Sequence, residues 1–206
     1  MIAFFFITCS LFAQNTNTQV ASIIDKTAQK YKALSTFSMN FKVYMENGAM
    51  NQDDEGVLWV KKDKYYLTFD DQIIANDGIT MWNFQKNINE VSLFEAEDDD
   101  FVLFHPAKML NNWNKEYDAK FIREEEIQKK QMLIVDFKPK KRSSFYKIRL
   151  FIDKNTSYIQ KMMLYEMDET TTTYIITKFK PNAIIEDTKF IFNKKDYPNV
   201  QINDMR

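Results

Sequence analysis

Residues 56–91 constrain the possible folds of this chain more than any other stretch. They form a series of short runs rich in β-branched and aromatic residues, which lie at 57–61, 64–69, 72–76 and 79–84, with a fifth run entering at residue 88. Asp, Asn and Gly fill the gaps, and Asp77-Gly78 is a pair that favours a type I′ hairpin turn with two positive φ angles. The pattern predicts a curved antiparallel sheet, in which one face can meet water while the other must be covered.

The rest of the chain predicts a helix before this sheet and more strands after it. Residues 19–34 carry their apolar side chains near one helical face, and residues 36–46 alternate as an amphipathic strand does. Residues 47–55 are expected to form a polar loop. Further strands are predicted at 117–123, 131–138, 145–153, 158–166 and 171–180, with one or two short strands near the C-terminus.

A short helix is predicted to interrupt the strands after residue 105. Pro106 suits the first turn of a helix, and Met109, Leu110 and Trp113 then fall on one side of it. There is no repeat, linker or low-complexity tract. We therefore predict one mainly β (α+β) domain of about ten or eleven strands, with one long and one short helix.

The N-terminal segment Met1–Ala13 is almost wholly apolar and carries no charge. It is too short to span a bilayer and is typical of the apolar core of a secretory signal. We expect cleavage after Ala13 and a single domain over residues 14–206. Cys9, the only cysteine, could instead carry a lipid anchor, and a cleaved chain has no cysteine for a disulfide or a metal site.

The sequence offers little for catalysis or for metal binding. The net charge of −1 argues against non-specific binding of nucleic acid. His105 is the only histidine, so no histidine-based metal cluster or triad can form, and a structural role is expected for it. The acidic run at 95–100 lacks the spacing of a calcium loop. We predict no catalytic residue, no metal and no cofactor, although a pair of carboxylates facing each other across a cleft would make an enzyme possible.

Several segments, in their order along the chain, resemble the LolA family of periplasmic outer-membrane lipoprotein carriers. The resemblance rests on an amphipathic N-terminal helix, the strand Thr-Phe-Ser-Met-Asn-Phe, Gly56–Lys61, Asp77–Trp82, Lys189–Phe192 and the final Val200–Arg206. It implies an incomplete antiparallel β-barrel, closed by the N-terminal helix and by the short internal helix acting as a lid. It also implies a periplasmic, monomeric carrier that takes acylated lipoproteins from an inner-membrane ABC transporter towards the outer membrane, where the acceptor is unknown.

The resemblance assigns the apolar sides of the strands to a cavity for acyl chains. Exposing an acyl chain to water costs about 0.8 kcal/mol per methylene, so ~15 methylenes need shelter on the order of 12 kcal/mol. With 18 Phe and 11 Met the chain has much apolar surface, which could line a cavity or simply fill a core. The candidate cavity residues are Phe41, Val43, Met45, Leu58, Val60, Leu67, Phe69, Leu133, Val135, Phe137, Ile148, Leu150 and Ile152.

The lid is assigned to Met109, Leu110 and Trp113, and its gate to Lys62. The family commonly has Arg-Pro after Leu-Trp-Val-Lys, and that Arg is thought to hold the lid through backbone carbonyls; here the residues are Lys62 and Asp63. Lysine can donate to carbonyls but lacks the planar guanidinium fork, and a solvated strand-end lysine is the alternative. Two other functions stay open: a lipid-anchored acceptor or a lipid or lipoprotein sensor on the same fold, and a cleft enzyme.

Overall fold

The computed structural model describes residues 10–48, 50–96, 105–111 and 113–206. Most of the predicted signal segment, 1–9, and most of the acidic run, 97–100, lie outside the described residues. The helices are α1 (Ser10–Lys32), α2 (Pro106–Met109) and α3 (Trp113–Glu116), with 3₁₀ turns η2 (Asp187–Phe190) and η3 (Lys194–Asp196). The strands are β1 (Thr36–Asn47), β2 (Met50–Lys61), β3 (Lys64–Phe69), β4 (Gln72–Asn76), β5 (Thr80–Gln85), β6 (Glu90–Glu95), β7 (Tyr117–Ile127), β8 (Lys130–Pro139), β9 (Phe145–Asp153), β10 (Ile159–Glu166), β11 (Thr171–Pro181) and β12 (Gln201–Asp204).

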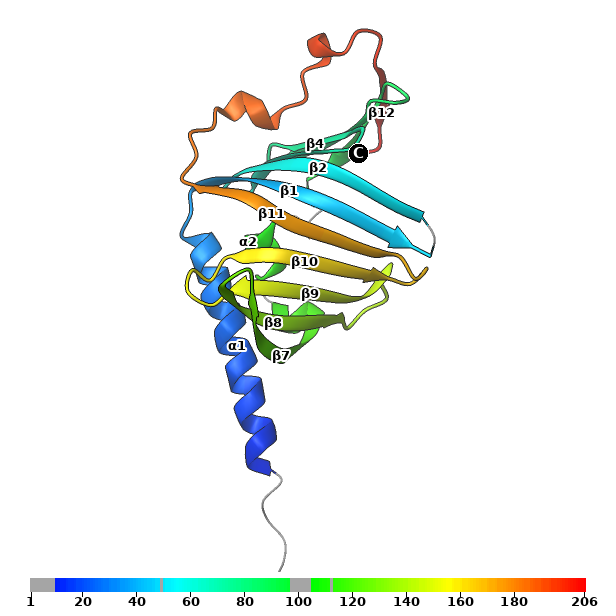
Figure 1. Ribbon diagram of the computed structural model, residues 1–206. Coiled ribbons are helices and arrows are strands. Elements are labelled where there is room, and N and C mark those ends of the chain that lie inside the picture. The colour runs from blue at the N-terminus through cyan, green and yellow to red at the C-terminus, as the bar shows by residue number, and fades with distance from the viewer. Residues whose placement is uncertain (1–9, 49, 97–104, 112) are drawn as a thin grey trace, which may run out of the picture.

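All twelve strands belong to one curved sheet (Figure 1). Their order is β12-β6-β5-β4-β3-β2-β1-β11-β10-β9-β8-β7, so β1 joins the N-terminal meander to the C-terminal one. Every pairing is antiparallel except that of β12 with β6, which is parallel. Within the described residues β7 and β12 do not pair with each other, so the sheet is an open, incomplete barrel, as expected.

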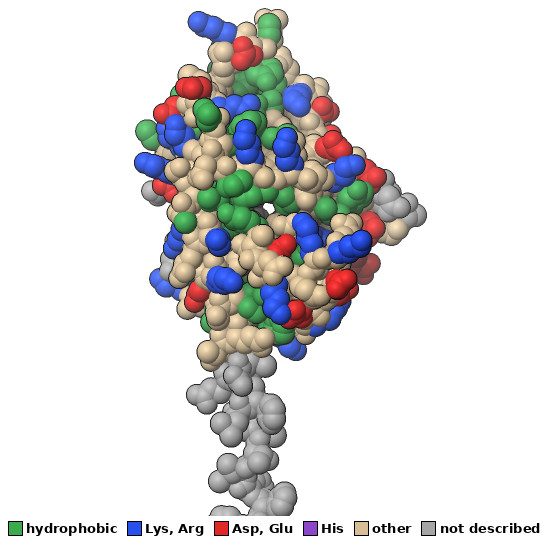
Figure 2. All heavy atoms as spheres, turned by 60° about the vertical axis from the view of Figure 1, so that its left-hand side comes forward, with side chains coloured by type: hydrophobic (Ala, Val, Ile, Leu, Met, Phe, Trp, Pro, Cys, Tyr) green, Lys and Arg blue, Asp and Glu red, His purple; other side chains and the backbone are tan. Residues whose placement is uncertain are grey.

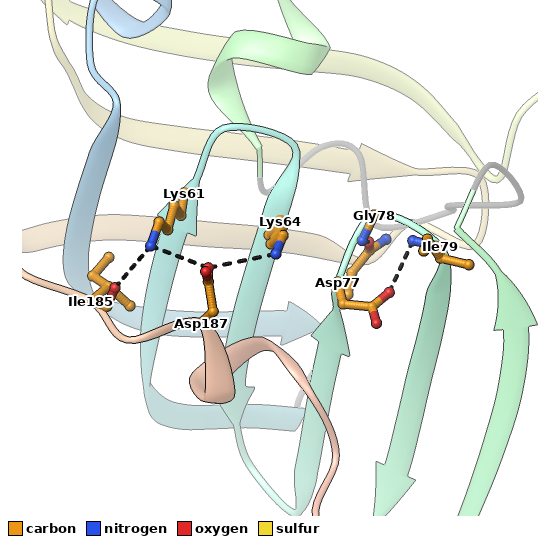
Figure 3. Close-up of polar contacts among 8 residues, drawn as sticks. Lys61, Lys64, Asp77, Gly78, Ile79, Ile185 and Asp187 are labelled. Carbon is orange, nitrogen blue, oxygen red and sulfur yellow. Dashed lines mark hydrogen bonds and ion pairs between the residues drawn. The ribbon is translucent and has the colours of Figure 1, made fainter.

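The turn at Asp77-Gly78 differs from the predicted type I′ hairpin. Only Gly78 has a positive φ, of 90°, whereas the predicted turn needs one at both residues. The Asp77 carboxylate instead accepts hydrogen bonds from the backbone N–H of Ile79 (Figure 3) and from that of Thr80, each at 2.9 Å. An Asx-type turn therefore joins β4 to β5, because the aspartate side chain takes the place of a backbone acceptor.

The structure adjusts the expectations for two segments. The predicted polar loop at 47–55 is short, because β2 already begins at Met50 and pairs with β1 along its whole length. Of the one or two short strands expected near the C-terminus one forms, β12, whereas Phe190 ends the 3₁₀ turn η2 and is fully buried. Cross-strand pairing therefore overrides the polar composition of residues 50–55.

Helix α1 crosses the concave side of the sheet and extends beyond its edge (Figure 1). It begins at Ser10, earlier than the predicted start at residue 19, and it contacts β7 and α2. Its buried face matches the predicted stripe, with Val20, Ile24, Thr27 and Tyr31 each less than 4 % exposed. Burying one large apolar side chain is worth about 1.5–3 kcal/mol, so this stripe fixes the helix on the sheet.

The C-terminal segment covers part of the outer face of the sheet. The Asp187 carboxylate lies 3.1 Å from the Lys61 ammonium and 3.5 Å from the Lys64 ammonium, and Lys61 also donates to the Ile185 carbonyl (Figure 3). Phe190 inserts beside these contacts into a small apolar cluster with Ala183 and Ile185. Exposed ion pairs contribute little, so burial of Phe190 anchors the segment more strongly than Asp187 does.

Gly56 allows β1 and β2 to carry an aromatic side chain between them. Gly56 faces Phe41 across the two strands, and a Cβ at this position would collide with the Phe41 ring and lie 2.8 Å from the Thr68 carbonyl oxygen. The Phe41 ring, 3 % exposed, occupies the space that a side chain on β2 would need.

We expect Gly56→Ala to lower the free energy of unfolding by about 1–3 kcal/mol, because the added methyl group overpacks the Phe41 ring. Urea denaturation measures this loss. In the Phe41→Leu background the same substitution should cost clearly less, since the shorter side chain leaves room for the methyl group. Equal costs in both backgrounds would contradict the close contact between Gly56 and Phe41.

Candidate functional site

The concave face of the sheet carries one continuous apolar cluster. Ten of the predicted cavity residues are buried in it: Phe41, Val43, Leu58, Val60, Leu67, Val135, Phe137, Ile148, Leu150 and Ile152. Phe69 and Leu133 are partly buried and pack against it, whereas Met45 is 39 % exposed near the end of β1. The structure therefore brings twelve of the thirteen together; whether they contact an acyl chain is a separate prediction.

Sequence reasoning missed several members of this cluster. Phe37 and Met39 precede Phe41 on β1 with the same alternation, which is the signal that could have found them. Tyr65, Met81 and Met162 belong to the same cluster on other strands. Both faces of those strands carry apolar residues, so alternation alone did not select the inner ones.

A small cavity remains between this cluster and α2. Its volume is about 40 Å³, and it is lined by Tyr31, Met39, Phe41, Leu58, Pro106, Met109, Ile159, Met162, Tyr174 and Ile176. None of these side chains is an acid or a base that is charged at neutral pH, and burial raises the pKa of the Tyr31 and Tyr174 hydroxyls. Ligand sites commonly have volumes of about 300–1,000 Å³, so a large apolar ligand fits only if α2 moves.

The predicted lid is divided between two short helices. Met109 and Leu110 are 4 % and 2 % exposed and belong to the concave cluster, next to Pro106 in α2. Trp113 begins α3, packs edge-on against Phe137 with 6.3 Å between ring centroids, and donates from Nε1 to an Asp25 carboxylate oxygen of α1 at 3.1 Å. All three cover the concave face, and only Met109 lines the small cavity.

His105 attaches α2 to the sheet through both ring nitrogens. Its Nδ1 accepts a hydrogen bond from the backbone N–H of Lys108 at 3.2 Å and so caps the helix. Its Nε2–H donates to the backbone carbonyl of Lys62, in the β2–β3 turn, at 2.9 Å. We call these two hydrogen bonds the His105 latch; they confirm the structural role expected for the lone histidine.

The latch requires a neutral imidazole. Burial lowers the pKa of His105, and the Lys108 ammonium lowers it further, while the hydrogen bond to the Lys62 carbonyl and the charge of the Asp63 carboxylate raise it. A proton on Nδ1 would remove the acceptor that caps α2. Protonation therefore opposes the closed position of α2.

The comparisons with known proteins agree with this architecture. A family model described as "Outer membrane lipoprotein carrier protein LolA" matches residues 32–193. This chain belongs to the LolA family. The match covers the whole sheet apart from β12, together with α2 and α3.

Individual relatives of this LolA-family chain are distant. An uncharacterized protein of Methanocaldococcus jannaschii is 25 % identical over 93 % of this chain, which spans only 57 % of that protein. The outer-membrane lipoprotein carrier protein of Pectobacterium carotovorum is 26 % identical over 88 % of this chain and 89 % of its own length. A solved uncharacterized protein from Thermus thermophilus shares the fold, with a TM-score of 0.61, 9 % identity and coverage of 89 % and 98 %.

Lys62 is the residue to which the family resemblance assigns the gate of the lid. The structure places it beside the lid, but the contact with α2 runs through its backbone carbonyl, which accepts from His105. Lys62 adopts a positive φ of 55°, and its side chain is exposed. Among the described residues its ammonium makes no hydrogen bond to a lid carbonyl, so the gating role assigned to Lys62 stays a prediction.

A second, larger hollow lies on the outer face of the sheet. It has a volume of about 760 Å³ and lies between the C-terminal segment and the strands that carry Trp59, Tyr66 and Ile73. The Lys189 ammonium lies over the Tyr66 and Trp59 rings, 4.0 and 5.6 Å from their centroids. Glu186 and Asp196 also line this hollow. Its lining therefore includes charged side chains, unlike the lining of the small cavity beneath α2.

Two kinds of feature are absent from the part of the chain that the structure describes. No group of three or more histidine, cysteine or acidic residues within them could hold a metal ion. None of their helices combines the length and the apolar character needed to cross a membrane. Figure 2 shows one face of the molecule, on which hydrophobic side chains border a small hollow and Lys and Arg side chains lie around it.

We predict that acidification loosens α2 through His105. The pKa of the folded state lies below the unfolded value of about 6.5, so the stabilising effect of the latch is complete above that value and is lost as the pH falls towards the lowered pKa. Hydrogen exchange of the Met109 and Leu110 amides, corrected for intrinsic rates, should show less protection at pH 5.5 than at pH 7.5.

His105→Asn is the matched control, because asparagine can still cap α2 but does not titrate in this range. Its amide protection in α2 should be lower than that of the wild type at pH 7.5 and should not change with pH. A pH-dependent loss in His105→Asn equal to that of the wild type would contradict the role of the imidazole.

Proposed function

We propose that this protein is a carrier that shelters the acyl chains of lipoproteins between its concave face and the helices that cover it. The observation that supports the proposal most is the cavity beneath α2, whose lining is apolar apart from two tyrosines and which is closed by a helix of four residues. No covalent step is involved, as befits a family described as carriers.

The energies are of a size that makes loading reversible. Sheltering ~15 methylenes yields on the order of 12 kcal/mol. Moving α2 aside breaks the two hydrogen bonds of the latch, worth about 0.5–1.5 kcal/mol each. It also exposes Met109 and Leu110, at about 1.5–3 kcal/mol each, unless the cargo covers them again. The free energy gained by sheltering the acyl chain therefore exceeds the free-energy cost of moving α2 by only a few kcal/mol, which permits both uptake and release.

The route of the cargo is a further part of the proposal. We propose that the protein is exported to the periplasm, acts as a monomer, and receives lipoproteins from an inner-membrane ABC transporter for transfer to the outer membrane. The relatives named as outer-membrane lipoprotein carrier proteins support this route. The rival role as a lipid-anchored acceptor depends on Cys9, which lies outside the described residues; the mass of the exported protein distinguishes the two, because an acylated Cys9 would exclude the soluble carrier.

Leu150→Glu should abolish binding of a synthetic acylated lipopeptide. Leu150 is fully buried in the concave cluster, and a carboxylate there is costly to bury beside an acyl chain. Ile175→Glu is the matched control, because Ile175 is 36 % exposed, and the same change there should leave binding intact. Titration calorimetry measures both variants, after circular dichroism has shown that they fold.

Met162→Phe gives a second test in case Leu150→Glu fails to fold. Met162 lines the small cavity, and a larger ring there reduces the space beneath α2 without adding charge. We expect weaker lipopeptide binding with a nearly unchanged unfolding midpoint. Full binding by folded Leu150→Glu or by Met162→Phe would show that the acyl chain lies elsewhere.

Trp113 should report the movement of the lid. In a Trp59→Phe/Trp82→Phe protein Trp113 is the only tryptophan, and both replaced side chains lie in the clusters of the outer face. If α3 moves with α2, the Trp113 indole leaves Phe137 and Asp25, and its emission changes when the lipopeptide binds. Unchanged emission at saturating lipopeptide would show that α3 is a static wall.

A further inference from the structure

A cleft with a basic rim opens beside α2, where the end of α1 and the β2–β3 turn come together. Its volume is about 440 Å³. Its floor includes side chains of the concave cluster, namely Tyr31, Phe37 and Val60. Its charged lining residues are Lys32, Lys62, Lys108 and Asp63.

Helix α2 is the wall between this cleft and the apolar cavity. Ala107 and Lys108 line the cleft, whereas Pro106 and Met109 line the cavity, and Tyr31 borders both. One displacement of α2 would therefore join the two spaces. The combined site would be apolar at one end and charged at the other, which is the polarity of an amphiphile.

The described lining of the cleft carries more basic than acidic side chains, although the whole chain has a net charge of −1. The relevant lysines are Lys32 and Lys62. Lys32 donates from Nζ to the neutral amide oxygen of Asn111 at 2.8 Å, and neither Lys32 nor Lys62 forms an ion pair with a described residue.

Lysines elsewhere on the surface do face carboxylates. Lys42 lies 3.2 Å from Glu55, and Lys154 lies 2.7 Å from Glu124. Lys32 and Lys62 therefore favour an anionic ligand, and the low-dielectric wall beneath them strengthens the attraction.

We propose that this cleft binds the phosphate-bearing headgroup of an anionic glycerophospholipid, whose acyl chains enter the apolar cavity beneath α2. Lysine binds phosphate as a point charge and needs no fixed bidentate geometry. A zwitterionic lipid brings its own cation and gains less from the ammonium groups of Lys32 and Lys62. The proposal shares the opening of α2 with the proposed function and adds a second class of cargo to it.

Native mass spectrometry of the full chain tests the headgroup site with two lipids that have identical acyl chains. Phosphatidylglycerol should bind about tenfold more tightly than phosphatidylcholine at low salt, which corresponds to about 1.4 kcal/mol. Lys32→Gln/Lys62→Gln should bring the two affinities together. The matched control Lys42→Gln/Lys154→Gln removes two lysines that lie outside the cleft and should keep the preference.

Three outcomes would overturn the proposal. The first is equal binding of the two lipids, and the second is a preference that survives in Lys32→Gln/Lys62→Gln. The third is displacement of phosphatidylglycerol by an equal concentration of inorganic phosphate, since a lipid held by its chains as well should resist the free anion.

Lipopeptides distinguish this proposal from the proposed function. Binding of a neutral lipopeptide should be the same in Lys32→Gln and in Lys42→Gln/Lys154→Gln, which leave the predicted gate Lys62 intact. If phosphatidylglycerol is preferred but no lipopeptide binds, the result contradicts the lipoprotein carrier role and supports the headgroup site. The protein could instead prefer a lipopeptide with two aspartates after its acylated cysteine over the neutral one, and show no preference for phosphatidylglycerol. That result overturns the proposal and indicates that the cleft binds the peptide part of the cargo. Binding of neither lipid nor lipopeptide contradicts both.

Discussion

The fold depends on one constraint, which is that an open, curved sheet has a concave apolar face and no second sheet to cover it. In a β-sandwich a partner sheet buries such a face, but here only helices are available. Helix α1 covers part of the face with a continuous stripe from Val20 to Tyr31 and connects directly to β1. The remaining area lies under α2 and α3, which are much shorter.

The shortness of α2 makes it the movable part of this cover. A helix of four residues cannot persist by itself, because forming the first turn of a helix costs more than its few hydrogen bonds return. It is held by the packing of Met109 and Leu110 and by the His105 latch, and cargo can replace the first of these. The same concave face can therefore serve as a core when α2 is closed and as a binding surface when it is open.

Strand periodicity made most of the sheet predictable. The meander from β2 to β6 follows from its apolar runs and turn residues, and the stripe on α1 follows from the spacing of Val20, Ile24 and Tyr31. The inner face of β9 was found correctly, because Ile148, Leu150 and Ile152 alternate with residues that point outwards. Local pattern was sufficient wherever the two faces of a strand differ in polarity.

Contacts between distant segments could not be predicted in the same way. The hydrogen bond from His105 to the Lys62 carbonyl joins positions 43 apart in the sequence, and no local pattern marks it. The Asp77 turn depends on a side chain replacing a backbone acceptor, which dipeptide preference does not reveal. The C-terminal segment is anchored to the outer face because Phe190 is buried beside Ala183 and Ile185, although the composition of the segment resembles that of a strand.

Photo-crosslinking with a lipopeptide that carries a diazirine at the end of its acyl chain tests the central claim most directly. Peptide mass spectrometry would identify the labelled residues. Labels on inward-facing residues of β1, β2 and β9, such as Met39, Leu58 and Leu150, are the result that the account predicts. Labels confined to the outer hollow, at Trp59, Tyr66 or Tyr197, would contradict it and place the acyl chain on the opposite face of the sheet.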